Sequence, residues 1–250
     1  MTQRLSRFRL LVSQILLNYK AEPSGIMENN VRNAPMSVLR VSCRKTKDLW
    51  NQLSAQTANH RLFDELGAAG PVEISDCLTR ALPPNYQLLR VDGRLSPDEL
   101  EIALIDTSTN AVVYYNRVEF IGELGGRPVV QCLPWRTHVY LDSPIPSGLH
   151  GDVLVNHLLE RYTVLLSDSE LTASGEHFWQ SQISRALHEK LSVYFWMADT
   201  GKLKQLTDTA QIEELKILRS DEPGDIDQRL VVISKIALSA DIKVQVEESV

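Results

Sequence analysis

Histidine and cysteine are the residues of this chain most suited to metal binding or nucleophilic chemistry, and their spacing favours neither role. The six histidines lie at 60, 138, 150, 157, 177 and 188. His150 and His157 are seven residues apart and lack the H-x-x-x-H spacing of a helical zinc site. The three cysteines, at 43, 77 and 132, form no C-x-x-C pair. We therefore predict no metal site, and we expect Cys132 to be a small buried hydrophobic residue.

Three motifs of common enzymes are absent from the chain. It contains no G-x-S-x-G, no G-x-x-x-x-G-K-[ST] and no H-E-x-x-H. Hydrolase, P-loop and zincin chemistry therefore lack support. What remains is a glycine-containing loop, D-S-P-I-P-S-G-L-H-G-D, in which Gly148 and Gly151 open a predicted helix.

The stretch from Ser147 to Asp199, together with the strand before it, is predicted to fold as a βαβαβ unit around that loop. The strand R-T-H-V-Y-L-D leads into the loop, and the helix spans His150 to Arg161. T-V-L-L-S-D has the length and apolar character of a strand buried on both faces. A second helix follows from about Gly175, and V-Y-F-W-M-A-D is another buried strand.

Antiparallel strands are predicted before this unit. From Tyr86 onward, Y-Q-L-L-R-V, E-I-A-L-I-D and A-V-V-Y-Y-N-R-V-E-F-I are separated by the turn sequences S-P-D-E-L and T-S-T-N, and V-V-Q-C-L-P-W continues the sheet. Helices are expected from Thr46 to Leu66 and from Val72 to Leu82. After residue 206, R-L-V-V-I-S-K and D-I-K-V-Q-V are expected to add antiparallel strands.

These elements predict an α+β fold whose mixed sheet combines an antiparallel meander with the βαβαβ unit. We divide the chain into an N-terminal helical region, 1–84, a central domain, 85–206, and a C-terminal strand extension, 207–250. With 43% hydrophobic and 23% charged residues, the composition is that of an ordinary soluble globular protein.

The charge of the chain is unevenly distributed. Residues 1–50 hold nine Lys and Arg against three acids, about +6, so a net charge of −6 leaves about −12 for the remainder. Leu5 to Tyr19 has the spacing of an amphipathic helix, with Arg4, Arg7 and Arg9 off its apolar face. This helix could pack on the body or on a second subunit, or dock on an acidic partner.

The cysteines and the apolar runs of the chain predict where in the cell the protein is located. Isolated cysteines without a signal-peptide pattern are typical of a reduced, cytoplasmic protein. The apolar run from Leu10 to Leu17 is too short to cross a bilayer, where about 20 residues are needed. We therefore predict a cytoplasmic protein without a membrane span.

The order of predicted elements resembles the fold of the GNAT superfamily of N-acetyltransferases. The resemblance covers about Tyr86 to Leu206: a strand meander, a strand running into a Gly-containing loop and helix, then strand, helix, strand and hairpin. The closest local likeness, Y-T-V-L-L-S-D-S-E-L-T-A-S-G-E-H-F-W, is similar to a block in phage- and prophage-encoded proteins of that fold.

The resemblance implies a coenzyme role for the loop. In that superfamily, backbone N–H groups of a loop of the form Arg/Gln-x-x-Gly-x-Gly/Ala surround the pyrophosphate of acetyl-coenzyme A. Gly148 and Gly151 would be the cofactor-binding residues, but their spacing is G-x-x-G and no Arg or Gln precedes them. Asp142 and Asp152 add negative charge, and two prolines, 144 and 146, remove N–H donors.

The resemblance also implies where catalytic groups would lie. The superfamily uses a carboxylate or water relay to deprotonate an amine and a tyrosine to protonate the thiolate. Glu119, His138 and Tyr194 stand on suitable strands, but nothing fixes their mutual geometry, and the favoured interpretation of each is an exposed strand residue or a core tyrosine. We therefore predict no catalytic residue.

Two functions from different classes remain open. The first is a non-catalytic interaction protein, phage-encoded for exclusion or defence, which binds and inhibits a nucleic-acid-handling protein such as a single-stranded-DNA-binding or replication protein. Arg4, Arg7, Trp135 and Arg136 are its predicted partner-binding residues. The second is an N-acyltransferase that uses acetyl-coenzyme A. Direct nucleic-acid binding is not favoured, because the body is acidic; the first helix or the tail strands could pair in a homo-oligomer.

Overall fold

A computed structural model of the chain describes residues 37–42, 50–51, 53–136, 145–167, 173–197, 200–212, 230–239 and 242–249. All of these belong to one compact unit. The predicted helix Leu5–Tyr19 lies outside them, as does the predicted strand after Arg136. Within the described ranges, no helix is long and apolar enough to cross a membrane.

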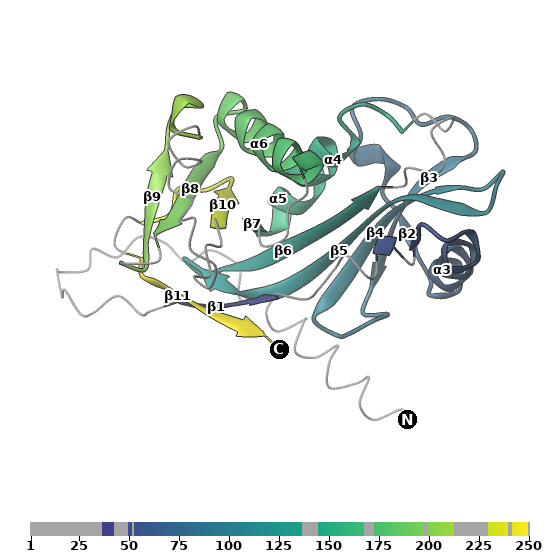
Figure 1. The fold of residues 1–250 in the computed structure, drawn as a ribbon, viewed down its shortest axis with the longest axis horizontal. Coiled ribbons are helices and arrows are strands. Elements are labelled where there is room, and N and C mark those ends of the chain that lie inside the picture. Colours follow the sequence, from purple (N-terminus) through teal and green to yellow (C-terminus); the bar gives the residue numbers. More distant parts are fainter. Residues whose placement is uncertain are drawn as a thin grey trace, which may run out of the picture. The chain divides into compact units, whose positions relative to one another are not determined.

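The described residues confirm an α+β fold built on a mixed sheet of nine strands, in the order β2-β3-β4-β5-β6-β7-β10-β8-β9 (Figure 1). The predicted meander is present as β3 (Tyr86–Asp92), β4 (Glu99–Asp106), β5 (Ala111–Leu124) and β6 (Arg127–Arg136), all paired antiparallel. Gly125 and Gly126 join β5 to β6, with φ of 59° and 75°. Two successive positive φ angles suit a two-residue hairpin turn, which explains the glycine pair.

The later part of the predicted βαβαβ unit, helix, strand, helix and strand, is also present, whereas the strand predicted to lead into its loop lies outside the described residues after Arg136. β6 pairs in parallel with β7 (Thr163–Ser167) through a helical run made of α4 (Leu149–Asp152), a π-helical segment η2 (Val153–Leu158) and α5 (Leu159–Arg161). Helix α6 (Ala173–His188) then leads to β8 (Ser192–Met197), and a hairpin follows to β9 (Lys202–Leu206).

One tail strand lies inside the sheet, not at its edge. β10 (Leu230–Ser234) is antiparallel to both β7 and β8 and separates them. Its five residues are all buried, which accounts for the unbroken apolar run L-V-V-I. β7 and β8, two strands of the predicted βαβαβ unit, are therefore not neighbours, because β10 lies between them.

The N-terminal region differs from its prediction. Helix α3 (Gln56–Ala68) is present, but the helix expected from Val72 to Leu82 is not. In its place lie the two-residue strand β2 (Val72–Glu73), which covers the edge of β3, and a 3-10 turn η1 (Ser75–Cys77). Pairing with β3 outweighs the weak helical pattern there.

The two faces of the sheet are covered differently (Figure 1). The helical run α4–η2–α5 and helix α6 cover one face, here called the helical face, and enclose the largest apolar cluster. On the opposite face, α3 covers a second cluster. A small parallel sheet of β1 (Ser37–Ser42) and β11 (Val244–Ser249) covers a third.

Candidate functional site

The sheet opens where β6 leaves β7. These strands pair at only three positions, from Val129↔Thr163 to Gln131↔Leu165, whereas β6 continues to Arg136 and β7 to Ser167. The carboxyl ends of the two parallel strands therefore diverge. In open sheets with parallel strands, ligands bind at such carboxyl ends, so this is the first place to look for a site.

Helix α4 begins above this opening at Gly148. Gly148 is the N-cap, with a left-handed φ of 87°, a conformation that glycine adopts without strain. The N–H of Leu149 donates to the carbonyl of Pro146 at 3.2 Å, and no side chain caps the helix.

The guanidinium of Arg185, on α6, lies directly against Gly151, the second glycine of the predicted coenzyme loop. A Cβ atom placed on Gly151 would lie 2.0 Å from Nη1 of Arg185. The guanidinium donates to the carbonyl of Gly148 at 3.3 Å, to Oδ1 of Asp152 at 2.7 Å and to Oε1 of Glu189 at 2.7 Å. Gly151 therefore makes room for an arginine of the chain itself.

Asp152 does not present its charge to the opening, contrary to expectation. Its side chain is 7% exposed, and Oδ2 accepts hydrogen bonds from the backbone N–H and the hydroxyl of Thr79, at 3.0 and 2.7 Å. Burial raises the pKa of Asp152, but the bonds from Arg185 and Thr79 outweigh it and hold that pKa below its ordinary value. Asp152 is a structural ion-pair partner that joins α4 to α6 and to Thr79, two residues after the end of η1.

A second residue at the helix start, His150, forms a neutral pair with a strand tyrosine. The hydroxyl of Tyr114 lies 2.7 Å from Nδ1 of His150, and the ring of Phe178 lies 4.3 Å away, centroid to centroid. Burial and the nearby charge of Arg185 lower the pKa of His150 to about 3. Burial also raises the pKa of Tyr114. Both groups are uncharged at neutral pH.

The cysteines on the helical face are not poised for nucleophilic attack. Burial raises the pKa of Cys132 to about 12, and burial with the charge of Asp76 raises that of Cys77 to about 11. A thiol attacks as its thiolate, so neither cysteine is reactive near pH 7. Among the described residues, no cluster of His, Cys, Asp and Glu could hold a metal ion.

The groups that the GNAT resemblance suggested for catalysis do not gather at this opening. Glu119 follows Arg117 on the face of β5 opposite the helical face, where its Oε1 lies 3.3 Å from Nε of Arg117. The hydroxyl of Tyr194, in the cluster under β1 and β11, accepts the N–H of Leu238 at 2.8 Å. His138 lies outside the described residues.

The predicted partner-binding residues are placed differently from one another. Trp135 is 6% exposed and belongs to the apolar cluster beneath α3, so its ring cannot form a stacking platform. Arg136 is exposed at the end of β6. Arg4 and Arg7 lie outside the described residues.

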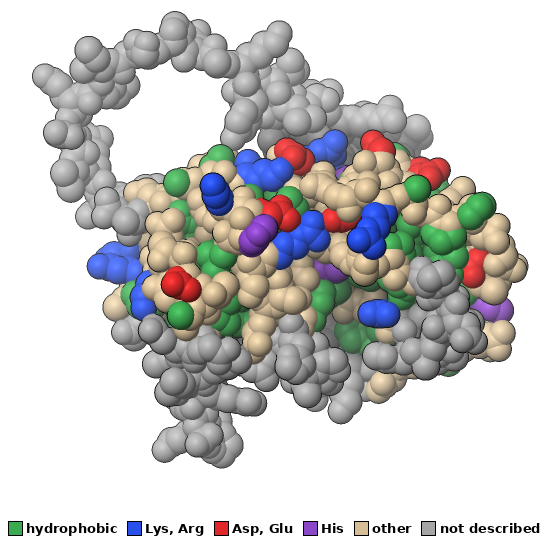
Figure 2. Space-filling model, turned by 90° about the horizontal axis from the view of Figure 1, so that it is seen from above, with side chains coloured by type: hydrophobic (Ala, Val, Ile, Leu, Met, Phe, Trp, Pro, Cys, Tyr) green, Lys and Arg blue, Asp and Glu red, His purple; other side chains and the backbone are tan. Residues whose placement is uncertain are grey.

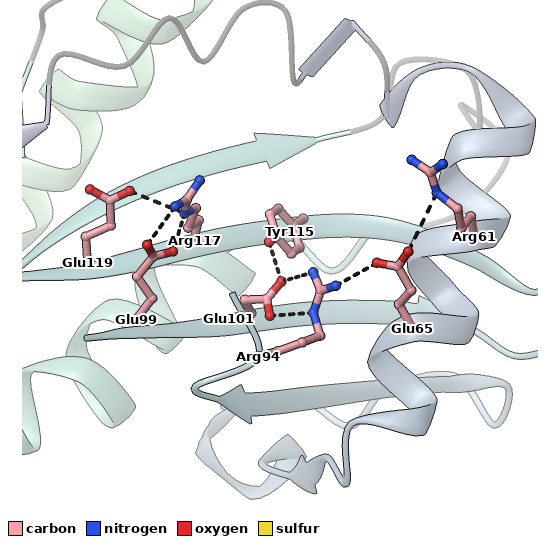
Figure 3. Close-up of polar contacts among 8 residues, drawn as sticks. All are labelled: Arg61, Glu65, Arg94, Glu99, Glu101, Tyr115, Arg117 and Glu119. Atoms are coloured by element: carbon pink, nitrogen blue, oxygen red, sulfur yellow. Dashed lines mark hydrogen bonds and ion pairs between the residues drawn. The ribbon is translucent and has the colours of Figure 1, made fainter. Parts of the chain in front are cut away.

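A charge network beside α3, which the sequence analysis did not predict, joins this helix to the sheet (Figure 3). Arg94, in the turn between β3 and β4, donates from Nε and Nη2 to both oxygens of Glu101, at 2.7 and 2.6 Å, and from Nη1 to Glu65 of α3 at 2.6 Å. The hydroxyl of Tyr115 donates to the same Glu101. On the neighbouring strand positions, Arg117 pairs with Glu99.

The charged side chains on the strands and in the β3–β4 turn of this network are mostly buried, whereas Glu65 of α3 is 47% exposed. The side chains of Glu101 and Glu99 are 1% and 8% exposed, and those of Arg94 and Arg117 are 17% and 13% exposed. Hydrogen bonds from Arg94 to Glu101 raise the pKa of the guanidinium despite its burial. The network therefore locks the β3–β4 turn, helix α3 and the centre of the sheet together through paired charges.

Comparison with models of protein families, with curated proteins and with solved structures gave no match.

Proposed function

We propose that this chain is a non-catalytic interaction protein on a GNAT-like scaffold, a phage-encoded exclusion or defence factor that binds and inhibits a nucleic-acid-handling protein. The order of meander, parallel crossover, second helix and hairpin supports the scaffold. The observation that carries the absence of catalysis is the position of Arg185. Its guanidinium covers Gly151, where backbone would have to approach a pyrophosphate closely.

The chemistry around the opening supports the same reading. His150 and Tyr114 form an uncharged pair, Asp152 is paired with Arg185, and Cys132 is held as a thiol. General acid–base catalysis needs a group whose pKa lies near the working pH. The pKa values of His150, at about 3, and Cys132, at about 12, lie far from neutral pH.

The surface charge indicates the kind of partner. Residues 51–250 carry about −12 by the count given above. On the face in Figure 2, described Lys and Arg side chains are interleaved with Asp, Glu and His, without a continuous basic patch. A body of this charge fits a basic protein surface better than a phosphate backbone. The proposed partner is a protein with a nucleic-acid-binding surface, such as a single-stranded-DNA-binding or replication protein.

Coenzyme titration tests the non-catalytic part. The melting temperature is measured with acetyl-coenzyme A from micromolar to millimolar concentration, beside desulfo-coenzyme A as a control. We expect no concentration-dependent rise, whereas a ligand at about 100 times its Kd would stabilise the fold by about 2.7 kcal/mol. A saturable rise with acetyl-coenzyme A would refute the proposal.

Partner binding is tested with a purified single-stranded-DNA-binding or replication protein. Light scattering should give the mass of a defined complex, and DNA added in excess should compete with this chain for the partner. A partner that binds DNA equally well at every concentration of this chain would contradict the inhibitory role.

An acetyl-coenzyme A-dependent N-acyltransferase is the second candidate, and one observation favours it. β6 and β7 diverge beneath a helix start that has a left-handed Gly148 and no capping side chain. This candidate requires Arg185 to leave Gly151 when coenzyme binds. It predicts that the Arg185→Ala variant binds acetyl-coenzyme A more tightly than the wild type, whereas the interaction proposal predicts no binding by either.

A further inference from the structure

The strand β1 is attached to the rest of the fold through β11. The two strands pair in parallel over six positions, from Ser37↔Val244 to Ser42↔Ser249, and the N–H of Ser37 donates to the carbonyl of Lys243 at 3.0 Å. The two strands form a sheet of their own, separate from the nine-stranded sheet. It joins the remainder of the fold by packing across β5.

That packing depends on a glycine in a bulge of β5. The register of β5 against β6 shifts between Phe120 and Gly122, and Gly122 has a φ of 147°. A Cβ atom at Gly122 would lie 2.5 Å from the carbonyl oxygen of Val38 and 3.0 Å from a methyl group of Leu39. The backbone of β1 therefore lies directly on a position that has no room for a side chain.

β11 is held against the β8–β9 hairpin by hydrogen bonds that do not involve β1. The N–H of Val244 donates to the carbonyl of Gly201 at 2.7 Å, and the indole N–H of Trp196 donates to the carbonyl of Val244 at 3.2 Å. Tyr194 fixes the chain shortly before β11 by accepting the N–H of Leu238. The first strand is thus held by a strand that follows it by some 200 residues, and that strand is held by β8 and β9.

The pair is a sheet of only two strands. An isolated two-stranded sheet is marginally stable, and parallel pairing is slightly weaker than antiparallel pairing. The pair is retained because Leu39, Val41 and Val244, which are 0–3% exposed, cover an apolar surface of the large sheet. Elements held mainly by one face in this way open before the core does.

We infer that β1 and β11 form a clasp, a pair of strands that opens as one unit ahead of the large sheet. Opening the clasp uncovers the apolar face of the large sheet that Leu39, Val41 and Val244 cover. Any event that removes β11 from the β8–β9 hairpin, such as capture of residues 244–249 by a partner, therefore also frees β1. This inference is independent of the function proposed above.

Hydrogen exchange of the unmodified chain tests the clasp without a mutation. Amides of residues 37–42 and 244–249 should exchange with the same opening equilibrium and the same dependence on denaturant, and faster than those of β4 and β5. Different denaturant dependences for the two strands, or protection equal to that of β4, would overturn the inference.

A glycine substitution with a matched control tests the coupling directly. Gly122→Ala should raise exchange in both β1 and β11, and tryptic cleavage after Arg40, by about tenfold through overpacking. The control is Gly126→Ala, which also imposes a side chain on a positive φ, of 75°, but has nothing within 4 Å of the new Cβ. It should leave both strands protected. Faster exchange of β1 alone, with β11 unchanged, would show that the strands open separately and refute the clasp.

If Gly122→Ala does not fold, a chain that stops after Lys243 gives the second perturbation. It should lose protection at Ser37–Ser42 while β4 and β5 remain protected. A shortened chain whose β1 stays as protected as in the full chain would refute the clasp as well.

Discussion

Replacing Arg94 by methionine should destabilise the protein far more than the same replacement at Arg61. Arg94→Met removes two hydrogen bonds from Glu101, whose side chain is 1% exposed, and one from Glu65. Glu101 would keep the hydrogen bond that it accepts from the Tyr115 hydroxyl. A buried charge that loses its partner costs about 3–5 kcal/mol, and we expect a loss in free energy of unfolding of that size.

Arg61 provides a matched control because it pairs with the same Glu65. Its side chain is 74% exposed, and its Nε lies 3.6 Å from Oε1 of Glu65. An exposed pair of this kind contributes about 0–1 kcal/mol, so Arg61→Met should change stability little. Both variants are measured by urea unfolding, followed by tryptophan fluorescence and far-UV circular dichroism.

A double variant separates two contributions to the loss of stability: the unpaired charge of Glu101 and the altered side-chain volume at position 94. Arg94→Met combined with Glu101→Gln removes the unpaired charge and leaves an amide oxygen that can accept from Tyr115. We expect about 1–2 kcal/mol of loss for this double variant, less than for Arg94→Met alone. The reasoning is refuted if Arg94→Met costs no more than Arg61→Met, or if the double variant is the least stable of the three.

Three further predictions concern the start of α4. Gly151→Ala should cost about 1–3 kcal/mol by displacing Arg185, whereas Gly67→Ala in α3, with nothing within 4 Å, should stabilise by about 0.5–1 kcal/mol; thermal unfolding of both checks this. Because the folded pKa of Asp152 is lowered, its contribution is present above the unfolded pKa of about 3.9 and is lost as pH falls through the folded pKa; urea midpoints of Asp152→Asn should therefore fall less steeply in acid. Because the folded pKa of His150 is lowered to about 3, stability should fall as pH drops from about 6.5 towards that value, and His150→Gln should flatten the profile.

Local patterns of the sequence were enough to predict most strands of the large sheet. The alternating runs from Tyr86 and the two short apolar runs at 163–167 and 192–197 appear as β3 to β8. These patterns are reliable because each strand buries its apolar residues wherever its neighbours come from. The helix expected from Val72 failed because the edge of β3 needed a partner, a requirement that no local pattern contains.

The site was less predictable than the strands. Gly148 and Gly151 were predicted to be functionally important. Nothing near them in sequence indicates Arg185, which lies 34 residues beyond Gly151 and fills the space that the missing side chain of this glycine leaves. The pairing of Tyr114 with His150 joins residues 36 positions apart, and no spacing rule relates them.

By itself, the sequence determined the class of fold, because the period of apolar residues fixes which segments become strands and helices. It also determined that three common enzyme motifs are missing. Only the tertiary structure decided that β10 enters the middle of the sheet, that Arg94 joins a turn to α3, and that β1 rests on β11. These choices depend on contacts between distant segments, where burial and charge pairing act across space and leave no trace in local composition.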